Sequence, residues 1–235
     1  PEENRRNLPI WYAHEPGSTM KVFLTAAALE DKKVNPHSKF NCENGRRKIG
    51  SAVIKDVKAR GTLTVAEIVK YSSNIGASKI GELLGRDKYH RYLKKFGFSE
   101  KTGIGLPGES KGQLASPRKW GAIELATISF GQGVSVTSLQ LVTALSAIAN
   151  GGYLMKPYVV EKIVDPEGNV VKENKPEVVT RVISYDTSDQ MKRMLKSVVE
   201  DGTGKRAQIT GFTVAGKTGT AQIPDPKFGG YHPDR

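Results

Sequence analysis

Three short clusters of polar residues carry the chemistry that this sequence can perform. The first is Ser18-Thr19-Met20-Lys21, which opens a mostly apolar segment. A serine hydroxyl is a weak nucleophile and needs a base to take its proton. In a helix, a spacing of three residues places the lysine amine on the same face as the serine oxygen. Desolvation or nearby cations lower the pKa of a lysine, so that its neutral amine can act as this base.

Two further clusters are Ser72-Ser73-Asn74 and Lys217-Thr218-Gly219-Thr220. A hydroxyl and a carboxamide two positions apart can face one cleft from a turn, where the first relays protons and the second binds amides. A cation and two hydroxyls beside an edge strand can bind a carboxylate, and a glycine there permits close backbone approach. Taken singly, each cluster also fits a structural role, as a helix cap, a helix C-terminus or a polar strand.

Residues 18–150, which include the first two clusters, are predicted to be mainly helical. Apolar residues on all sides predict a buried helix from Ser18 to Glu30. A capping box at Thr64 and Glu67 predicts a helix that ends near Tyr71. Residues 31–62 should be irregular with short strands, and 98–116 should form a long ordered loop. Further helices are predicted at 75–84, 87–96, 117–128 and 138–150.

The pattern changes after residue 150. The predicted elements there are a strand at 158–164, a turn at 165–169, a returning strand from 170, a helix at 185–200 and a strand at 211–216. We therefore expect one domain over residues 1–235, with a helical lobe over about 18–150 and an α/β lobe over about 151–235.

Composition excludes several classes of protein. The single cysteine, Cys42, excludes an intramolecular disulfide and a thiolate metal cluster, and the four histidines show no ligand-like spacing, so a structural zinc site is not expected. The net charge is +12, but the cations lie in short scattered clusters, which favours an anionic membrane or polymer over nucleic acid as the partner. Neither a run of 18 apolar residues nor a signal peptide is present, so we expect any anchoring segment to lie outside this sequence.

In this order the clusters resemble the S-x-x-K, S-x-N and K-T-G motifs of penicillin-binding proteins and class A β-lactamases. Four flanking stretches resemble the transpeptidase domain of class B penicillin-binding proteins, and within it the division-specific, FtsI-type branch. They are Glu15–Lys21, Tyr71–Gly76, Ser129–Gly133 and Gly216–Gln222. The resemblance covers nearly the whole chain. It implies an α/β (α+β) fold of the penicillin-binding protein and serine β-lactamase type, with an antiparallel sheet flanked by helices and an all-helical lobe.

The resemblance implies a catalytic role for five residues. Ser18 would be the acylated nucleophile and Lys21 its general base. Ser72 would relay the proton toward the leaving amine, and Asn74 would hold an amide of the donor peptide. Lys217 would supply positive charge near Ser72 and the substrate carboxylate.

The same resemblance implies the substrate-binding residues. The hydroxyls of Thr218 and Thr220 would contact the substrate carboxylate beside Gly219. The backbone N–H groups of Ser18 and Thr220 would form the oxyanion hole. The loop at 130–133 would shape the cleft.

The implied activity is that of a peptidoglycan D,D-transpeptidase in septal cell-wall synthesis during cell division. A stem peptide ending in D-Ala-D-Ala acylates the serine, an amine of a neighbouring stem takes the acyl group, and β-lactams mimic the donor. No cofactor is needed. The expected partners include division-machinery proteins, among them a glycosyltransferase. The catalytic domain would lie on the periplasmic side of the bacterial inner (cytoplasmic) membrane, held by an N-terminal anchor missing from this sequence.

Several alternatives stay open. A class A β-lactamase usually has S-D-N and a deacylating glutamate, whereas Ser73 is the middle residue here and no E-x-x-L-N segment is present. A D,D-carboxypeptidase would use water as the acceptor. A β-lactam-sensing receptor or a non-catalytic peptidoglycan-binding domain would bind without turnover. Because only 17 residues precede Ser18 and 15 follow Thr220, we expect a truncated domain with an incomplete sheet.

Overall fold

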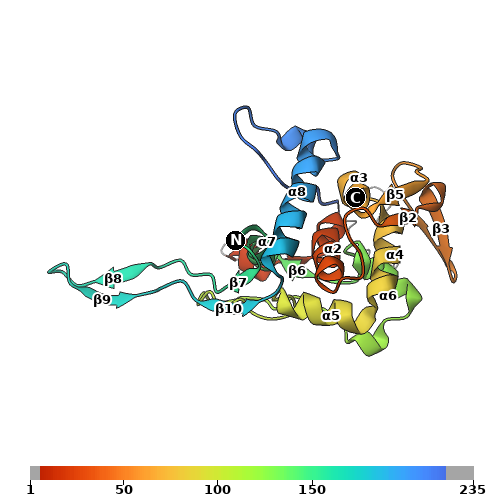
Figure 1. Ribbon diagram of the computed structural model, residues 1–235. Coiled ribbons are helices and arrows are strands. Elements are labelled where there is room, and N and C mark those ends of the chain that lie inside the picture. Colours follow the sequence, from red (N-terminus) through yellow and green to blue (C-terminus); the bar gives the residue numbers. More distant parts are fainter. Residues whose placement is uncertain (1–5, 221–235) are drawn as a thin grey trace.

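The computed structural model describes residues 6–220, in which helices combine with short antiparallel strands (Figure 1). The helices are α1 (Leu8–Trp11), α2 (Met20–Glu30), α3 (Val65–Tyr71), α4 (Asn74–Leu84), α5 (Arg86–Lys95), α6 (Ala122–Ser129), α7 (Ser138–Ala149) and α8 (Tyr185–Asp201). Ten of the eleven residues of α2 are buried. A helix that is apolar on all sides needs partners on all sides, and α2 contacts α3, α4, α5, α6 and α8. The predicted buried helix is confirmed, although its α-helical part begins at Met20 after a 3₁₀ turn (Gly17–Thr19).

Capping residues set the boundaries of the other helices. α3 opens with a capping box, in which the Glu67 amide donates to Thr64 Oγ1 at 3.2 Å and the Thr64 amide donates to the Glu67 carboxylate at 2.8 Å. This confirms the helix predicted to end near Tyr71. α8 opens at Ser184, whose hydroxyl donates to Glu30 at 2.8 Å, so the end of α2 is joined to the start of α8.

All the described sheets are two-stranded and antiparallel. The pairs are β1 (Ala13–His14) with β6 (Val136–Thr137), β2 (Lys39–Asn41) with β5 (Thr62–Thr64), β3 (Arg46–Ile49) with β4 (Ala52–Lys55), β7 (Tyr153–Met155) with β10 (Val178–Arg181), and β8 (Lys162–Val164) with β9 (Val170–Glu173). The predicted class, helices combined with antiparallel strands, is confirmed. Within residues 6–220 no pair extends to a third strand.

Two predicted elements are shorter than expected. The helix predicted at 117–128 is divided into a 3₁₀ turn (Pro117–Lys119) and α6, because the backbone at Gly121 is extended with ψ of −171°. The strand predicted at 158–164 is reduced to β8, where pairing with β9 begins.

The strand predicted at 211–216 is wrong. Its backbone is irregular and begins with a turn at Gly211, where φ is +83°. A strand needs a neighbour that takes its amide and carbonyl groups, and none of the ladders in residues 6–220 includes this segment. The Gly216 amide donates instead to the carbonyl of Leu195 on α8, at 3.2 Å. The division into two lobes near residue 150 stays a prediction.

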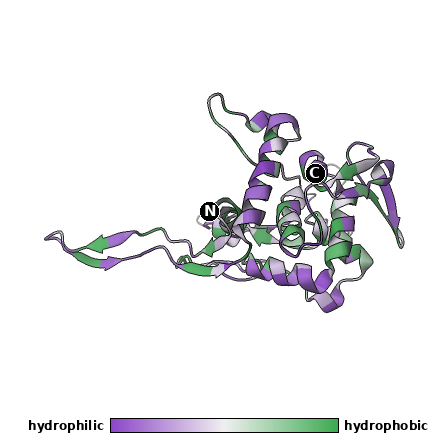
Figure 2. Ribbon diagram, viewed as in Figure 1, coloured by the Kyte–Doolittle hydropathy of each residue, from purple (hydrophilic) through white to green (hydrophobic). Residues whose placement is uncertain are grey.

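The β8–β9 ribbon projects away from the helices (Figure 1), and apolar residues occur along it (Figure 2). All its residues are exposed, and none belongs to the three polar clusters. The chemistry is therefore positioned by the helical body. No helix within residues 6–220 combines the length and the apolar character needed to cross a lipid bilayer.

Replacing Gly131 by alanine should destabilise the loop that carries Ser18. A Cβ added at Gly131 would lie 2.0 Å from the carbonyl oxygen of Gly17, and the φ of Gly131 is +86°. Gly108→Ala is the matched control, since φ is +81° and its Cβ meets nothing within 4 Å. We expect Gly108→Ala to cost about 1 kcal/mol of unfolding free energy, and Gly131→Ala about 3 kcal/mol or more, in chemical denaturation. Equal losses would show that the contact with Gly17 does not matter.

Candidate active site

The three predicted clusters converge at the N-terminal end of α2. Ser18 lies in the 3₁₀ turn that leads into α2, and Lys21, on its first turn, is only 1% exposed. Ser72 is the C-cap residue of α3, and Asn74 is the first residue of α4. Lys217 comes from the segment after α8 and lies 2.9 Å from Ser72 Oγ. The structure therefore brings together all five residues predicted to be catalytic.

The Lys21 amine is the point at which the clusters meet. Its Nζ lies 3.0 Å from Ser18 Oγ, 3.1 Å from Ser72 Oγ and 2.7 Å from Asn74 Oδ1. The backbone carbonyl of Ser72 is a fourth neighbour, at 2.6 Å. A single buried nitrogen thus links the turn before α2 to the turn between α3 and α4.

Burial lowers the pKa of the Lys21 amine well below its ordinary value of 10.5, because desolvation disfavours the ammonium form. The positive charge of Lys217 lowers this pKa further, whereas the carboxylate of Asp56 raises it. Desolvation is the largest of the three causes. Lys21 therefore becomes a neutral amine at a lower pH than a solvated lysine does.

The neighbours of Lys21 leave its lone pair for Ser18. A neutral amine has two N–H donors and one lone pair. The Ser72 carbonyl oxygen and Asn74 Oδ1 can each accept a hydrogen bond but cannot donate one. The Asn74 amide nitrogen donates to the carbonyl of Lys55 at 2.9 Å, which fixes the orientation of this carboxamide. With both N–H groups directed to these two acceptors, the lone pair can take the proton of the Ser18 hydroxyl.

Ser72 presents two oxygens to two lysines because of its backbone conformation. Its φ of +62° and ψ of 40° lie in the left-handed region, which is uncommon for a residue with a Cβ. Its carbonyl then faces Lys21, while its hydroxyl lies between the amines of Lys21 and Lys217. Burial lowers the pKa of Lys217 to about 8. The Ser72 hydroxyl can therefore exchange a proton with either lysine.

Asp56, which follows β4, is a site residue that sequence reasoning missed. Its carboxylate accepts from the Ser73 hydroxyl at 2.6 Å, from the Asn74 amide at 2.6 Å and from the Ile75 amide at 3.1 Å. It satisfies amides at the N-terminus of α4, where a negative charge is stabilised. Asp56 thereby fixes the turn that carries Asn74. It lies in a charged stretch without a motif, so the sequence offers no signal for this contact.

Thr203 is a second missed residue, and it joins two of the clusters. Its amide donates to the carbonyl of Lys70 at 3.2 Å, two residues before Ser72. The Thr218 hydroxyl donates to Thr203 Oγ1 at 3.2 Å. Gly202 permits this approach, because a Cβ there would lie 2.7 Å from the Lys70 carbonyl. The end of α8 therefore sets the distance between the S-x-N turn and the K-T-G segment.

The predicted substrate-binding residues lie at the rim of this site. Thr218, Gly219 and Thr220 are exposed, and a Cβ at Gly219 would lie 3.1 Å from the side chain of Thr19. Together with the end of α8, they line a hollow of about 630 Å³. The 130–133 loop contacts the S-x-x-K turn from another side, since the Gly17 amide donates to the Gly131 carbonyl at 3.1 Å.

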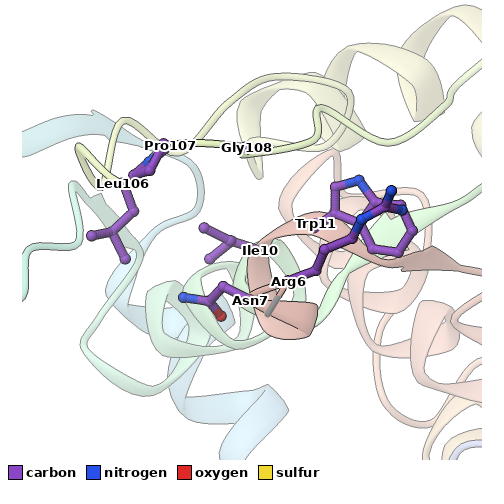
Figure 3. A pocket seen from close by; sticks show the side chains of 7 residues that line it. All are labelled: Arg6, Asn7, Ile10, Trp11, Leu106, Pro107 and Gly108. Atoms are coloured by element: carbon purple, nitrogen blue, oxygen red, sulfur yellow. The ribbon is translucent and has the colours of Figure 1, made fainter. Parts of the chain in front are cut away.

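A second hollow, of about 510 Å³, lies apart from the three clusters. Figure 3 shows Ile10 and Trp11 of α1 facing the loop at 106–108 across it. None of the predicted site residues lines this hollow. Residues 6–220 contain no group of three or more histidine, cysteine or acidic residues arranged to hold a metal ion. Ala221 and Gln222, the last residues of the fourth flanking stretch, lie outside the described residues.

Comparison with known sequences gives a consistent result. The family described as "Penicillin binding protein transpeptidase domain" matches residues 2–235. Stage V sporulation protein D of Bacillus subtilis (strain 168) is 44% identical over 97% of this chain and 36% of its own length. Penicillin-binding protein PbpB of Mycobacterium tuberculosis (strain H37Rv) is 34% identical over 94% of this chain and 33% of its own length. The chain thus spans about a third of these relatives.

Solved structures agree. The apo form of penicillin-binding protein 3 from Mycobacterium tuberculosis has a TM-score of 0.90 and 33% identity, covering 97% of this chain and 53% of that one. The transpeptidase domain of penicillin-binding protein 3 from Burkholderia pseudomallei has a TM-score of 0.87 and 34% identity, covering 97% of this chain and 66% of that one. The mycobacterial protein has also been solved with aztreonam and with ampicillin. On its motifs, their geometry and these matches, the chain belongs to the transpeptidase family of class B penicillin-binding proteins.

Proposed function

We propose that this chain is the catalytic part of a peptidoglycan D,D-transpeptidase that works through an acyl-enzyme at Ser18. The observation that carries the proposal is the set of contacts at Lys21, whose Nζ lies within 3.1 Å of Ser18 Oγ, Ser72 Oγ and Asn74 Oδ1. Relatives named peptidoglycan D,D-transpeptidase support it, such as PenA of Neisseria flavescens at 36% identity over 94% of this chain.

In the proposed acylation, the neutral amine of Lys21 takes the proton of Ser18 as its oxygen attacks the carbonyl between the two D-alanines. A bond forms from Ser18 Oγ to the carbonyl carbon, and the peptide C–N bond breaks. The departing amine of the terminal D-alanine receives a proton through the Ser72 hydroxyl. Lys217, 2.9 Å from Ser72 Oγ, can stabilise the charge on that hydroxyl during the transfer.

The second step transfers the acyl group to an amine of a neighbouring stem peptide. As that amine attacks the ester, it gives a proton to Lys21 or, through the Ser72 hydroxyl, to the same lysine. A bond forms from its nitrogen to the acyl carbon, the bond from Ser18 Oγ to that carbon breaks, and Lys21 returns the proton to Ser18. The acyl group therefore ends on the acceptor amine as the cross-link. The step uses the same residues as the acylation, Ser18, Lys21 and Ser72. β-Lactams would acylate the same serine.

Substrate binding is assigned to the K-T-G segment. The Lys217 ammonium and the hydroxyls of Thr218 and Thr220 suit a terminal carboxylate. Asn74 would bind an amide of the donor peptide. Gly219 lets this segment lie against the turn that carries Ser18. The backbone N–H groups of Ser18 and Thr220 would form the oxyanion hole.

We propose the cellular role from the resemblance of the motifs and their flanking stretches to the FtsI-type branch. That role is septal cell-wall synthesis beside division proteins and a glycosyltransferase, on the periplasmic face of the membrane through an anchor. The name of the Bacillus relative favours sporulation as a second role. We also propose that residues 18–150 and 151–235 act as two lobes around the cleft.

Incubation with benzylpenicillin should add one covalent adduct, detected by intact-protein mass spectrometry. Ser18→Ala should abolish it, a loss of about a thousandfold or more in acylation rate, because the attacking oxygen is gone. The exposed Ser116→Ala is the control and should react as the wild type does. A stem peptide ending in D-Ala-D-Ala should release D-alanine.

Each alternative has its own outcome in that assay. An adduct lost within seconds indicates a β-lactamase, and D-alanine release without transfer to an added amine indicates a carboxypeptidase. A stable adduct without D-alanine release indicates a sensor. No adduct on folded protein overturns the proposal.

The protonation of Lys21 can be followed by NMR of lysines labelled at Cε. Its pKa should lie well below 10.5 in the wild type. Lys217→Met should raise it, because a repelling cation is lost, and Asp56→Asn should lower it, because an attracting anion is lost. A Lys21 pKa unchanged in both variants would contradict the electrostatic account.

A further inference from the structure

The loop between β4 and β5, residues 56–61, is fixed to the S-x-N turn only at its first residue. Asp56 binds Ser73, Asn74 and Ile75, and the preceding Lys55 carbonyl accepts from Asn74. Beyond Asp56 the loop becomes exposed, and Val57 is 98% exposed. Both ends of the loop are held to residues 42–45, since the Asp56 amide donates to the Gly45 carbonyl at 3.1 Å and the Cys42 amide donates to the Gly61 carbonyl at 2.7 Å. Between these ends, a contact with α3 would restrain the exposed part of the loop.

Arg60 supplies such a contact. Its guanidinium carbon lies 3.7 Å from the centroid of the Tyr71 ring, which is van der Waals distance and means stacking on the face. The corresponding distance for the arginine–tyrosine pair on β10 and β7, Arg181 and Tyr153, is 5.3 Å. Both Arg60 and Tyr71 are half-buried, so solvent competes less for the cation than at an exposed site.

Tyr71 follows a residue that is tied to the end of α8. This residue, Lys70, pairs with Asp201 at 2.6 Å, and its carbonyl accepts from the Thr203 amide. The ring that Arg60 covers is therefore attached to a segment tied to the end of α8. It also directly precedes Ser72, whose left-handed backbone directs its carbonyl to Lys21.

We propose that Arg60 is a positioning residue, which by stacking on Tyr71 closes the 56–61 loop over the S-x-N turn and keeps Asp56 on Ser73 and Asn74. The loop then contacts the helices on both sides of the S-x-N turn, α4 through Asp56 and α3 through Arg60. The predicted effect on the acylation rate rests on the proposed function, whereas the predicted effect on hydrogen exchange does not. Arg60 also lies near Glu67: hydrogen bonds from Thr64 lower the pKa of the Glu67 carboxyl most, and the charge of Arg60 lowers it further. The test must therefore separate stacking from charge.

The test compares five single variants, one of them a control, and one double variant. Arg60→Ala removes the cation, and Tyr71→Leu removes the ring but leaves Arg60 and Glu67. Arg60→Lys keeps the charge but loses the planar group, and Tyr71→Phe keeps the ring. Arg181→Ala breaks another arginine–tyrosine pair, with Tyr153, as the matched control. Each is measured for the second-order rate of acylation by a fluorescent penicillin, and for hydrogen exchange of the Asn74 and Ile75 amides, which donate to Asp56.

Arg60→Ala and Tyr71→Leu should each slow acylation by about tenfold and speed exchange of both amides, while Tyr71→Phe stays within about threefold of the wild type. Arg60→Lys should resemble Arg60→Ala, because an ammonium keeps the charge near Glu67 but cannot stack as a planar guanidinium does. The Arg60→Ala, Tyr71→Leu double variant should be no slower than either single variant, because both remove one contact. Arg181→Ala should change neither quantity. Amides of α2 serve as the internal control for global unfolding.

Three results would overturn the proposal: additive losses in the double variant, unchanged exchange in Arg60→Ala, or equal effects of Arg60→Ala and Arg181→Ala. A loss in Arg60→Ala with none in Tyr71→Leu would assign the effect to the charge on Glu67 and also overturn it. If the wild type is not acylated, the proposed function fails, and the exchange measurement alone decides whether Arg60 holds the loop.

Discussion

The burial of one lysine amine is the constraint on which the rest of the site depends. A charged amine in the interior is costly unless acceptors surround it, and Lys21 has four oxygens within 3.1 Å. Two of them can only accept, which leaves the lone pair of the neutral form for Ser18. The same burial lowers the pKa of Lys21, so geometry and protonation favour the same reaction.

The surrounding fold supplies these acceptors. α2 is enclosed by five helices, and this removes water from Lys21. The capping box of α3 sets where that helix ends, and Ser72 then turns its carbonyl inward from a left-handed conformation. Asp56 holds the start of α4, and Thr203 fixes the K-T-G segment relative to the end of α3. Strain at Ser72 is thus sustained by contacts on both sides of the turn.

The sequence was informative where local patterns decide structure. Helix periodicity and the capping box at Thr64 predicted most helices. The five residues that meet at the site were implied by the resemblance of the three motifs, in their order, to those of a known family. Asp56 and Thr203 were missed because they act through contacts between segments, which leave no periodicity or motif in the chain. The strand predicted at 211–216 failed for a related reason, because alternation predicts a strand but only a neighbouring strand makes one.

The pH dependence of the acylation rate tests the central claim most directly. Because Lys21 must be neutral, the rate should rise with pH through a midpoint well below 10.5, and because Lys217 must be charged, loss of its proton near pH 8 should lower the rate. Lys217→Met should remove this decrease and leave a slower, rising profile. A single rise centred near 10.5 would contradict the account, because Lys21 would then behave as a solvated lysine.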